Sequence, residues 1–473
     1  MAFNKILLFS TLASFLSLGC VQAKVHYHRW EITYQYKSPD CFNKLAITIN
    51  GQTPGPTIYA SQGDTIVVEV NNSLLTENTA IHWHGIQTGT IGTPWMDGTE
   101  GVTQCPILPG ETFIYRFVVD RPGTYFYHSH YGLQRSAGLN GMIVVKVPEG
   151  FKEPFRYDHE YNILLHDWWH NSTYDQSVGL QMPGNQFKFV GEPQSLLMNG
   201  RGRFNCSLAV SGYCNASLPE CTPLTITVAH GKTYLLRIAS ITSLSALSFE
   251  IEGHNLTVVE ADGHYADPLP NVVSRKPGTP TGTRLFNYYG IPRGRVPPTI
   301  LPSGPLWNDT DYRMMQSWAT RAHPNFIEPP PAQSDRVIIL LNTQNKINGF
   351  TRWSLNNVSH DLPHTPYLIA MKNNLLHNAN TLTANNSETH PWHLHGHDFW
   401  VLGCGRGKFN PETDPTNYNL KDPTLKNNVA LQTSGWIAIR FKQIIPACGH
   451  FIATSNLIFS WVWGLCLKKV LTG

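Results

Sequence analysis

Alternating apolar and polar residues are the most frequent pattern along this 473-residue chain, and they predict β-strands. The alternation covers residues 44–50, 65–70 and 112–119, and Gly-Met-Ile-Val-Val-Lys-Val at 141–147 is typical of a strand that closes this first group. Successive side chains of a strand point to opposite faces, so alternation indicates one buried and one exposed face. We find no helix-period repeat of any length, which favours β-sandwich domains.

A second group of strand patterns follows the turn-forming residues Pro148–Gly150. These patterns lie at residues 161–165, 224–228, 233–238, 257–260 and 336–341. Before the last of them, a proline-rich stretch from about 276 to 331 has no clear periodicity and is longer than the loops of compact domains. A third group of elements follows, and the chain is long enough for several hydrophobic cores.

The charge and hydropathy of the chain argue against two classes of partner, nucleic acids and membranes. The formal net charge is +3 and 14% of residues are charged, so the composition gives no reason to expect a nucleic-acid partner. The apolar run at 457–467 is too short to span a bilayer, and we expect no membrane partner. Many glycines (38) and prolines (33) agree with short strands joined by tight turns.

The N-terminus predicts a secretory signal peptide at residues 1–23. Lys5 precedes an apolar run from Ile6 to Leu18, and Val21 and Ala23 are small residues suited to cleavage. The mature chain is expected to begin near Lys24 outside the cell, where disulfides persist. Eight glycosylation sequons agree with a secreted glycoprotein, at Asn71, Asn171, Asn205, Asn215, Asn255, Asn308, Asn357 and Asn385.

The 21 histidines are concentrated in short segments that predict a metal centre. His-Trp-His-Gly occupies 82–85, His-Ser-His occupies 128–130, and His-Pro-Trp-His-Leu-His-Gly-His occupies 390–397. In a strand, residues i and i+2 face the same side, so each His-x-His pair directs two imidazoles into one space. Neutral imidazole suits copper, zinc, iron and nickel. About one such pair is expected by chance, so the signal is the presence of several.

Two further histidine pairs have simpler explanations. His26 and His28 lie at the mature N-terminus, and we interpret them as a solvated strand edge. His166 and His170 have helical i, i+4 spacing, but no partner cluster is evident, so a structural role is favoured over metal binding.

The three histidine segments resemble the first three copper motifs of the multicopper oxidases. Their order and separation match, and Asn-Gly-Gln-Thr-Pro-Gly-Pro-Thr-Ile at 50–58 also fits. Val-Val-Glu-Ala-Asp-Gly-His at 258–264 and Val-Ser-Arg-Lys-Pro-Gly-Thr-Pro-Thr-Gly at 273–282 resemble the plant ascorbate oxidase group within that family. The resemblance runs from about residue 24 to 441, with gaps.

The resemblance implies an all-β fold of three cupredoxin-like Greek-key β-sandwich domains. Their expected bounds are 24–150, 151–342 and 343–441, followed by a tail at 442–473. The second and third domains are expected to be incomplete, because strand-bearing segments of the family are missing near 270 and near 377. A sandwich that lacks strands exposes backbone edges and part of its core.

The resemblance also implies an oxidase with type 1, type 2 and type 3 copper, which transfers electrons from L-ascorbate to dioxygen and gives water. His82 and His393 match ligands of the type 2 copper, and His390 matches a ligand of the type 1 blue copper. The matches to ligands of the type 3 pair are His84, His128, His130 and His395.

Other residues are assigned by the same resemblance. Trp353 matches a substrate-cleft tryptophan, whereas Phe189 departs from the family's second one. The family's disulfides match Cys41 with Cys221 and Cys206 with Cys214, and the partner of Cys105 has no counterpart. Family members are often dimers, so a homodimer is an expectation. Because the resemblance is to plant enzymes, we expect the secreted protein to be located in the apoplast.

The fourth copper motif, a His-Cys-His segment, is absent after Phe441. A blue copper site needs a thiolate and two imidazoles, so we expect type 1 copper and part of the type 3 pair to be lost. Codons permitted for residues 443–459, read in a shifted frame, encode Trp-Pro-Phe-His-Cys-His-Ile-Glu-Pro-His. We therefore interpret 442–473 as a frame-shifted tail, and the internal gaps as skipped exons or gene-model errors.

Two alternatives to an ascorbate-oxidising enzyme remain. One is a catalytically silent secreted glycoprotein that lacks the blue copper site but keeps some copper affinity. The other is a laccase-like phenol oxidase, which shares the copper motifs but not the ascorbate oxidase stretches.

Overall fold

The fold is taken from a computed structural model of the chain. It describes residues 23–88, 92–210, 213–222, 225–245, 247, 249–251, 253–270, 285–289, 309–359, 363–373, 390–432, 434–442, 449–453 and 464–467. The signal peptide, the predicted gap near 377, most of the tail and the sequons at Asn308 and Asn385 lie outside these ranges. In the described part, no helix has the length and apolar character needed to cross a membrane.

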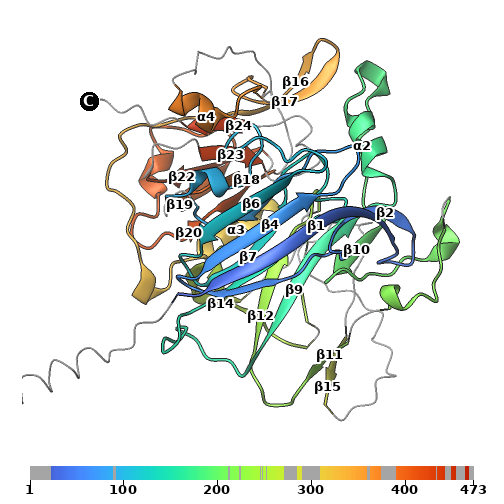
Figure 1. Ribbon diagram of the computed structural model, residues 1–473. Helices are drawn as coiled ribbons and strands as arrows, with labels where there is room; N and C mark the ends of the chain where they lie inside the picture. The colour runs from blue at the N-terminus through green and yellow to red at the C-terminus, as the bar shows by residue number, and fades with distance from the viewer. Residues whose placement is uncertain are drawn as a thin grey trace, which may run out of the picture.

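Residues 24–150, called the first region, form two four-stranded sheets in the blue to teal part of Figure 1. One sheet has the order β2-β1-β4-β6, from Lys44–Ile49, Val25–Lys37, Thr65–Asn72 and Thr112–Val118. The other has the order β3-β8-β7-β5, from Ile58–Ser61, Asn140–Lys146, Gly123–Ser129 and Ile81–His84. A short 3-10 helix, η1 (Pro94–Met96), follows β5.

The two sheets of the first region enclose one apolar core. Trp30, Ile66 and Phe117 come from one sheet, and Trp83 and Tyr127 come from the other, and all five are almost fully buried in the same cluster. The alternation predicted from the sequence explains this packing, because every second residue of each strand faces the partner sheet. The residues between them face outward and are available for other contacts.

Residues 151–341, called the second region, contribute smaller sheets (green to yellow in Figure 1). The order β10-β9-β12 joins Ser195–Met198, His159–Trp168 and Tyr234–Ser240. Two pairs join β11 (Thr225–Val228) to β15 (Leu285–Tyr288) and β13 (Thr257–Ala261) to β14 (His264–Pro270). The helices are α2 (Thr173–Leu180), α3 (Thr310–Ala319), η2 (Gly184–Gln186), η3 (Cys206–Leu208), η4 (Pro219–Cys221) and η5 (Pro324–Phe326).

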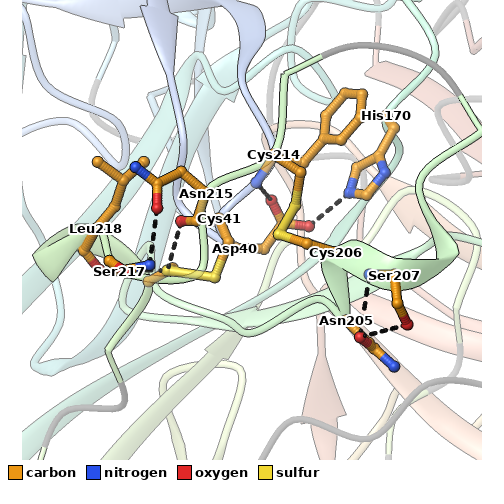
Figure 2. Close-up of a disulfide and its surroundings, with 12 residues drawn as sticks. Asp40, Cys41, His170, Asn205, Cys206, Ser207, Cys214, Asn215, Ser217 and Leu218 are labelled. Carbon is orange, nitrogen blue, oxygen red and sulfur yellow. Dashed lines mark hydrogen bonds and ion pairs between the residues drawn. A yellow bond between two sulfur atoms is a disulfide. The ribbon is translucent and has the colours of Figure 1, made fainter.

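Two disulfides lie at the junction of the first and second regions. Cys41 is bonded to Cys221, and Cys206 is bonded to Cys214 (Figure 2). Beside them, Nε2 of His170 lies 2.7 Å from Oδ2 of Asp40. The Cys41–Cys221 bond joins the two regions covalently across 180 positions of the chain.

Residues 342–473, called the third region, form two sheets and a hairpin (orange to red in Figure 1). The sheet order β21-β18-β23-β24 joins Asn428–Leu431, His390–Leu394, Gly449–Ala453 and Gly464–Leu467. The order β20-β19-β22 joins Leu425–Lys426, Phe399–Arg406 and Gly435–Arg440. The hairpin pairs β16 (Asn342–Ile347) with β17 (Phe350–Leu355), and the helices are α4 (Tyr367–Lys372) and η6 (Asp414–Asn417).

Most strand predictions are confirmed, to within a few residues. The strand predicted at 336–341 is wrong: these residues have no strand structure, and Val337 and Ile339 are 76% and 63% exposed. A strand requires a neighbour that accepts its backbone hydrogen bonds, and apolar composition alone does not supply one. Although the sequence shows no helix-period repeat, the described residues include the short helices α2, α3 and α4. Part of the long loop, at 285–288, is the strand β15.

Candidate metal centre

Three strands place histidines on the face opposite their core residues. In β5, Ile81 and Trp83 point into the core of the first region, so His82 and His84 point out of the other face. In β7, Tyr125 and Tyr127 point into the same core and His128 points out. β5 and β7 are paired, with His82 opposite His128. Two-residue periodicity therefore gathers these imidazoles on one side of the sheet.

β18 of the third region brings further histidines to the same place. Its ring-to-ring contacts include His84 with His393, whose centroids lie 3.9 Å apart and stacked. His82 lies at the centre, 4.2 Å from His395. The other four ring centroids around His82 lie 5.4 to 5.7 Å away, in His84, His128, His130 and His393. We call these six residues the histidine cluster.

The ligand atoms of the histidine cluster are close enough to share metal ions. Those of His82, His84 and His128 lie within 4.8 Å of one another, and so do those of His82, His393 and His395. All six side chains are buried, with at most 6% exposure. The cluster therefore lies between the first and third regions, and neither region contains it alone.

Backbone carbonyls fix the tautomer of several rings. Nδ1 of His82 lies 2.8 Å from the carbonyl oxygen of Asp97, and Nδ1 of His393 lies 2.8 Å from that of Asn427. A carbonyl oxygen can only accept, so Nδ1 carries the proton and donates it. The Nε2 lone pairs of both rings then face the cluster, and both atoms are buried without a hydrogen-bond partner among the described residues.

His84 is held by the opposite ring atom. Its Nε2 lies 2.6 Å from the side-chain amide of Asn428, which leaves the buried Nδ1, unpartnered among described residues, as the ligand atom. Buried imidazole nitrogens without hydrogen bonds are costly, and a bound metal removes that cost. The donor set consists of neutral nitrogen atoms, which suits copper. The residues present therefore fit a copper cluster.

Burial keeps four of the cluster rings neutral. It lowers the pKa of His84, His128 and His395 well below the usual histidine value, and neighbouring histidines or Arg135 add to the effect. It lowers the pKa of His393 to about 3. Metal binding requires deprotonated nitrogen, so these four rings are ready to bind without first releasing protons at neutral pH.

Two carboxylates beside the cluster were not singled out from the sequence. Oδ2 of Asp97 lies 2.9 Å from Nδ1 of His395, and Oε2 of Glu100 lies 3.0 Å from Nδ1 of His130. Burial would raise the pKa of Asp97, but the rings of His82 and His395 hold it well below its usual range. Both carboxylates orient the rings, and the ionised Asp97 would balance the positive charge of a bound metal.

Gly98 lets this acidic segment lie against β5. It has φ +83°, and a Cβ there would lie 1.7 Å from the carbonyl oxygen of Ile81. Only glycine fits this close approach. The sequence Met-Asp-Gly-Thr at 96–99 places this glycine directly after Asp97, and it was the available signal for a carboxylate at the cluster.

His390 is the one predicted ligand outside the cluster. It lies three residues before His393 in β18 and therefore faces the opposite side of that strand. Burial lowers its pKa to about 4. It shares this face with Trp392, which packs with Trp353 and Leu355. Trp353 is 2% exposed, and its role in substrate binding stays a prediction.

No cysteine next to a histidine pair occurs in the described part of the third region. Described cysteines outside disulfides include Cys105 and Cys404, and burial raises the pKa of the Cys404 thiol. One of the two strands paired with β18 is β23, which pairs Ile452 with His393 and has the sequence Gly-His-Phe-Ile-Ala. This strand carries one histidine and no cysteine.

The remaining histidine pairs do not join the cluster. His26 and His28 lie on β1, where Nε2 of His26 is 2.8 Å from Oδ2 of Asp64, so this edge is half-buried and not simply solvated. His166 lies on the strand β9 and not on a helix. His170 contacts Asp40.

Family models for multicopper oxidases match three successive segments, 31–150, 159–274 and 328–448. Together they include every histidine of the cluster. The chain belongs to the multicopper oxidase family.

Relatives in this multicopper oxidase family include plant enzymes. An L-ascorbate oxidase of Brassica rapa subsp. pekinensis is 44% identical over 516 aligned positions, which cover 91% of this chain and 89% of the relative. Laccase-11 of Arabidopsis thaliana is 30% identical, covering 98% and 95%. Because 516 positions exceed the 473 residues of the chain, the ascorbate oxidase contains segments that this multicopper oxidase lacks.

The fold also matches solved structures. Fet3p, a multicopper oxidase that functions in iron import, aligns with a TM-score of 0.77 and 24% identity, covering 94% of this chain and 90% of Fet3p. This likeness concerns the fold, and it agrees with the mostly β architecture of three cupredoxin domains.

Proposed function

We propose that this multicopper oxidase is a secreted oxidase of the ascorbate oxidase type, which transfers electrons from L-ascorbate to dioxygen and gives water. The observation that carries the proposal is the histidine cluster, with its buried and unpartnered ligand nitrogens on His82, His84 and His393. Carbonyls and carboxylates hold the rings in place before any metal binds.

Copper, when bound, supplies the one-electron chemistry that joins a one-electron donor to dioxygen. His82 and His393 would hold the type 2 copper. The ligands proposed for the type 3 pair are His84, His128, His130 and His395. His390, on the other face of β18, would serve the type 1 copper. Burial of the cluster excludes bulk water, and Asp97 provides a carboxylate within hydrogen-bond distance of His395.

Similarity to relatives supports ascorbate over phenols as the electron donor. The identity to the ascorbate oxidase is 44%, against 30% for the laccase. The location outside the cell is supported by six described sequon asparagines, none of which is buried: Asn71, Asn171, Asn205, Asn215, Asn255 and Asn357. Homodimer formation and the frame-shifted origin of 442–473 stay predictions.

One observation favours a second candidate, a copper-binding glycoprotein without turnover. The sequence after Phe441 has no His-Cys-His segment, and the third family match ends at Cys448. Without a thiolate beside His390, the electron entry point has too few ligands. Copper would then bind only in the histidine cluster.

Copper loading of the purified full chain separates the two candidates. Bound copper is counted, and visible absorption and ascorbate-dependent oxygen uptake are recorded. A blue charge-transfer band with oxygen uptake supports the oxidase, whereas bound copper with neither supports the second candidate. The variant His393→Gln should lower the copper count, and the control His170→Gln, which removes a partly buried histidine outside the cluster, should not. A chain that binds no copper contradicts both candidates.

The donor is tested in the same assay. Oxygen uptake with L-ascorbate is compared with uptake with a simple phenol at equal concentration. Faster turnover of the phenol would replace the ascorbate proposal with a laccase-like activity.

A further inference from the structure

Asp262 lies in the second region, outside the histidine cluster, yet it contacts the segment that holds two cluster rings. It occupies the turn between β13 and β14 and accepts hydrogen bonds at Oδ2 from the backbone N–H groups of Asn427 (3.2 Å) and Asn428 (3.0 Å). Nζ of Lys426 lies 3.3 Å from the same oxygen. One carboxylate oxygen thus contacts three consecutive residues of the third region.

Asn427 and Asn428 each hold a histidine from a different region. The carbonyl of Asn427 accepts from Nδ1 of His393 at 2.8 Å. The side-chain amide of Asn428 lies 2.6 Å from Nε2 of His84, and also 3.0 Å from Oδ1 of Asn427. The ring centroids of His84 and His393 lie 3.9 Å apart. A shift of this two-residue segment would therefore move both rings.

The turn that carries Asp262 is itself fixed against the first region. Asp262 has φ +53°, which aspartate tolerates better than most residues, and the next residue is Gly263. A Cβ on Gly263 would lie 2.2 Å from the hydroxyl of Tyr125 in β7. The N–H of Gly263 donates to Oε1 of the half-buried Glu260 at 2.8 Å. The carboxylate therefore has a fixed position relative to the strand that carries His128.

We infer that Asp262 is a positioning residue of the copper centre, which acts from the second region through Asn427 and Asn428 to set the ring orientation of His393 and His84. The inference rests on the proposed copper function of the cluster. Residues beyond the ligands orient them, and their loss commonly lowers metal affinity 10–100-fold. Asp262 contacts the residues that hold the ligands and not the ligands themselves, so we expect the loss of copper affinity to be at the lower end of this range, about tenfold.

The test compares copper affinity among variants of the full chain. Asp262→Gly removes the carboxylate without strain at positive φ, and Asp262→Asn keeps an acceptor oxygen and tolerates the same turn. Asp158→Ala is the matched control: this carboxylate also accepts from a backbone N–H (Thr233, 2.8 Å) and a lysine (Lys232, 2.9 Å), outside the cluster. Affinity is measured by competition with a chelator, together with the electron paramagnetic resonance spectrum of bound copper.

Asp262→Gly should lower copper affinity about tenfold and alter the nitrogen hyperfine pattern. Asp262→Asn should recover part of the affinity, and Asp158→Ala should match the wild-type chain. Unchanged affinity and spectrum in Asp262→Gly would overturn the inference. So would an equal loss in Asp158→Ala, since that indicates general destabilisation. If circular dichroism shows that Asp262→Gly does not fold, the copper affinity of Asp262→Asn is compared with that of the control Asp158→Ala, and this comparison decides.

A metal-free readout separates this inference from the copper proposal. Long-range nitrogen–proton NMR of histidine-labelled, copper-free chain reports which ring nitrogen is protonated, with His393→Gln used for assignment. Asp262→Gly should disturb the Nδ1–H form of His393, Asp262→Asn should disturb it less, and Asp158→Ala should leave it unchanged. If the wild-type chain binds no copper, the proposed function fails and this measurement still decides: an undisturbed tautomer in Asp262→Gly overturns the inference.

Discussion

The first and third regions supply histidines to the same cluster but are built differently. In the first, two four-stranded sheets share one core that holds β5 and β7 in place. In the third, the described apolar clusters are small, such as Trp353 with Leu355 and Trp392. Four of the six cluster histidines therefore have a rigid support of their own. The other two depend on contacts from neighbouring regions, such as that of Asp262 with the first residue of β21.

The disulfides also distinguish the first region from the third. The first region is joined to the second by Cys41–Cys221, and buried polar contacts such as Lys44 with the carbonyl of Trp169 add to this junction. No disulfide reaches the third region within the described residues, and Cys105 is a free thiol on the first. We expect the third region to respond more to solution conditions and less to single core changes.

The largest expected effect concerns the Cys41–Cys221 bond. Replacing both cysteines by serine should lower the free energy of unfolding by about 5 kcal/mol, because this bond closes a loop of 180 positions. Replacing Cys206 and Cys214, which are 8 positions apart, should cost about 2.5 kcal/mol. Denaturant titration of both double variants measures these two decreases in the free energy of unfolding. Equal decreases would contradict the argument from loop length.

Replacing a core tryptophan by alanine in the first and in the third region tests directly whether the two cores differ in their contribution to stability. Trp83→Ala should destabilise the first region by about 3–5 kcal/mol, because Trp83 is fully buried between the two sheets. Trp392→Ala, in the smaller cluster of the third region, should cost less, since its surroundings can collapse more easily. The two variants are compared by thermal unfolding. A larger loss for Trp392→Ala would reverse the comparison.

A pH effect is expected at the junction of the first and second regions. Burial lowers the pKa of Lys44 to about 7, while nearby Asp40 and Asp167 oppose the shift. Between pH 7 and about 10.4 the unfolded chain binds the proton and the folded chain does not, so stability rises with pH. The burial penalty of Lys44 is fully present below pH 7 and is relieved above it.

The variant Lys44→Met should remove this contribution. Its free energy of unfolding, measured at pH 6 and pH 9, should rise less with pH than that of the wild-type chain, by up to about 1.4 kcal/mol per pH unit above 7. Lys232→Met, at an exposed lysine paired with Asp158, is the control and should keep the wild-type pH dependence in this range. Parallel curves for Lys44→Met and the wild-type chain would contradict the lowered pKa of Lys44 in the folded chain.

Much of the first region could be predicted from the sequence because its strands have one buried and one exposed face. The same periodicity made His82 and His128 recognisable as neighbours on one side of a sheet. Asp97 was not recognised, because its contact with His395 joins residues 298 positions apart. Asn427 was equally hidden, since it acts through its backbone carbonyl. Tertiary contacts of this kind leave no local pattern in the sequence.

The predicted strand at 336–341 failed for a related reason, and it gives the smallest expected effect on stability. Its apolar side chains predicted a buried strand, yet Val337, Ile338 and Ile339 are between 44% and 76% exposed. Asn356 supplies polar contacts here, accepting from the N–H of Leu341 at 2.6 Å. An exposed apolar run with free backbone edges favours self-association.

Replacing Val337 and Ile339 by threonine should therefore change the free energy of unfolding by less than about 0.5 kcal/mol while reducing self-association. Light scattering against concentration measures the association, and denaturant titration measures the stability. Leu75→Thr, at an isolated apolar residue of the first region that is 85% exposed, is the control and should alter neither. If the double variant instead loses more than about 1 kcal/mol, the run is buried in solution, and the second region is better packed here, where it meets the third, than the exposure of these side chains indicates.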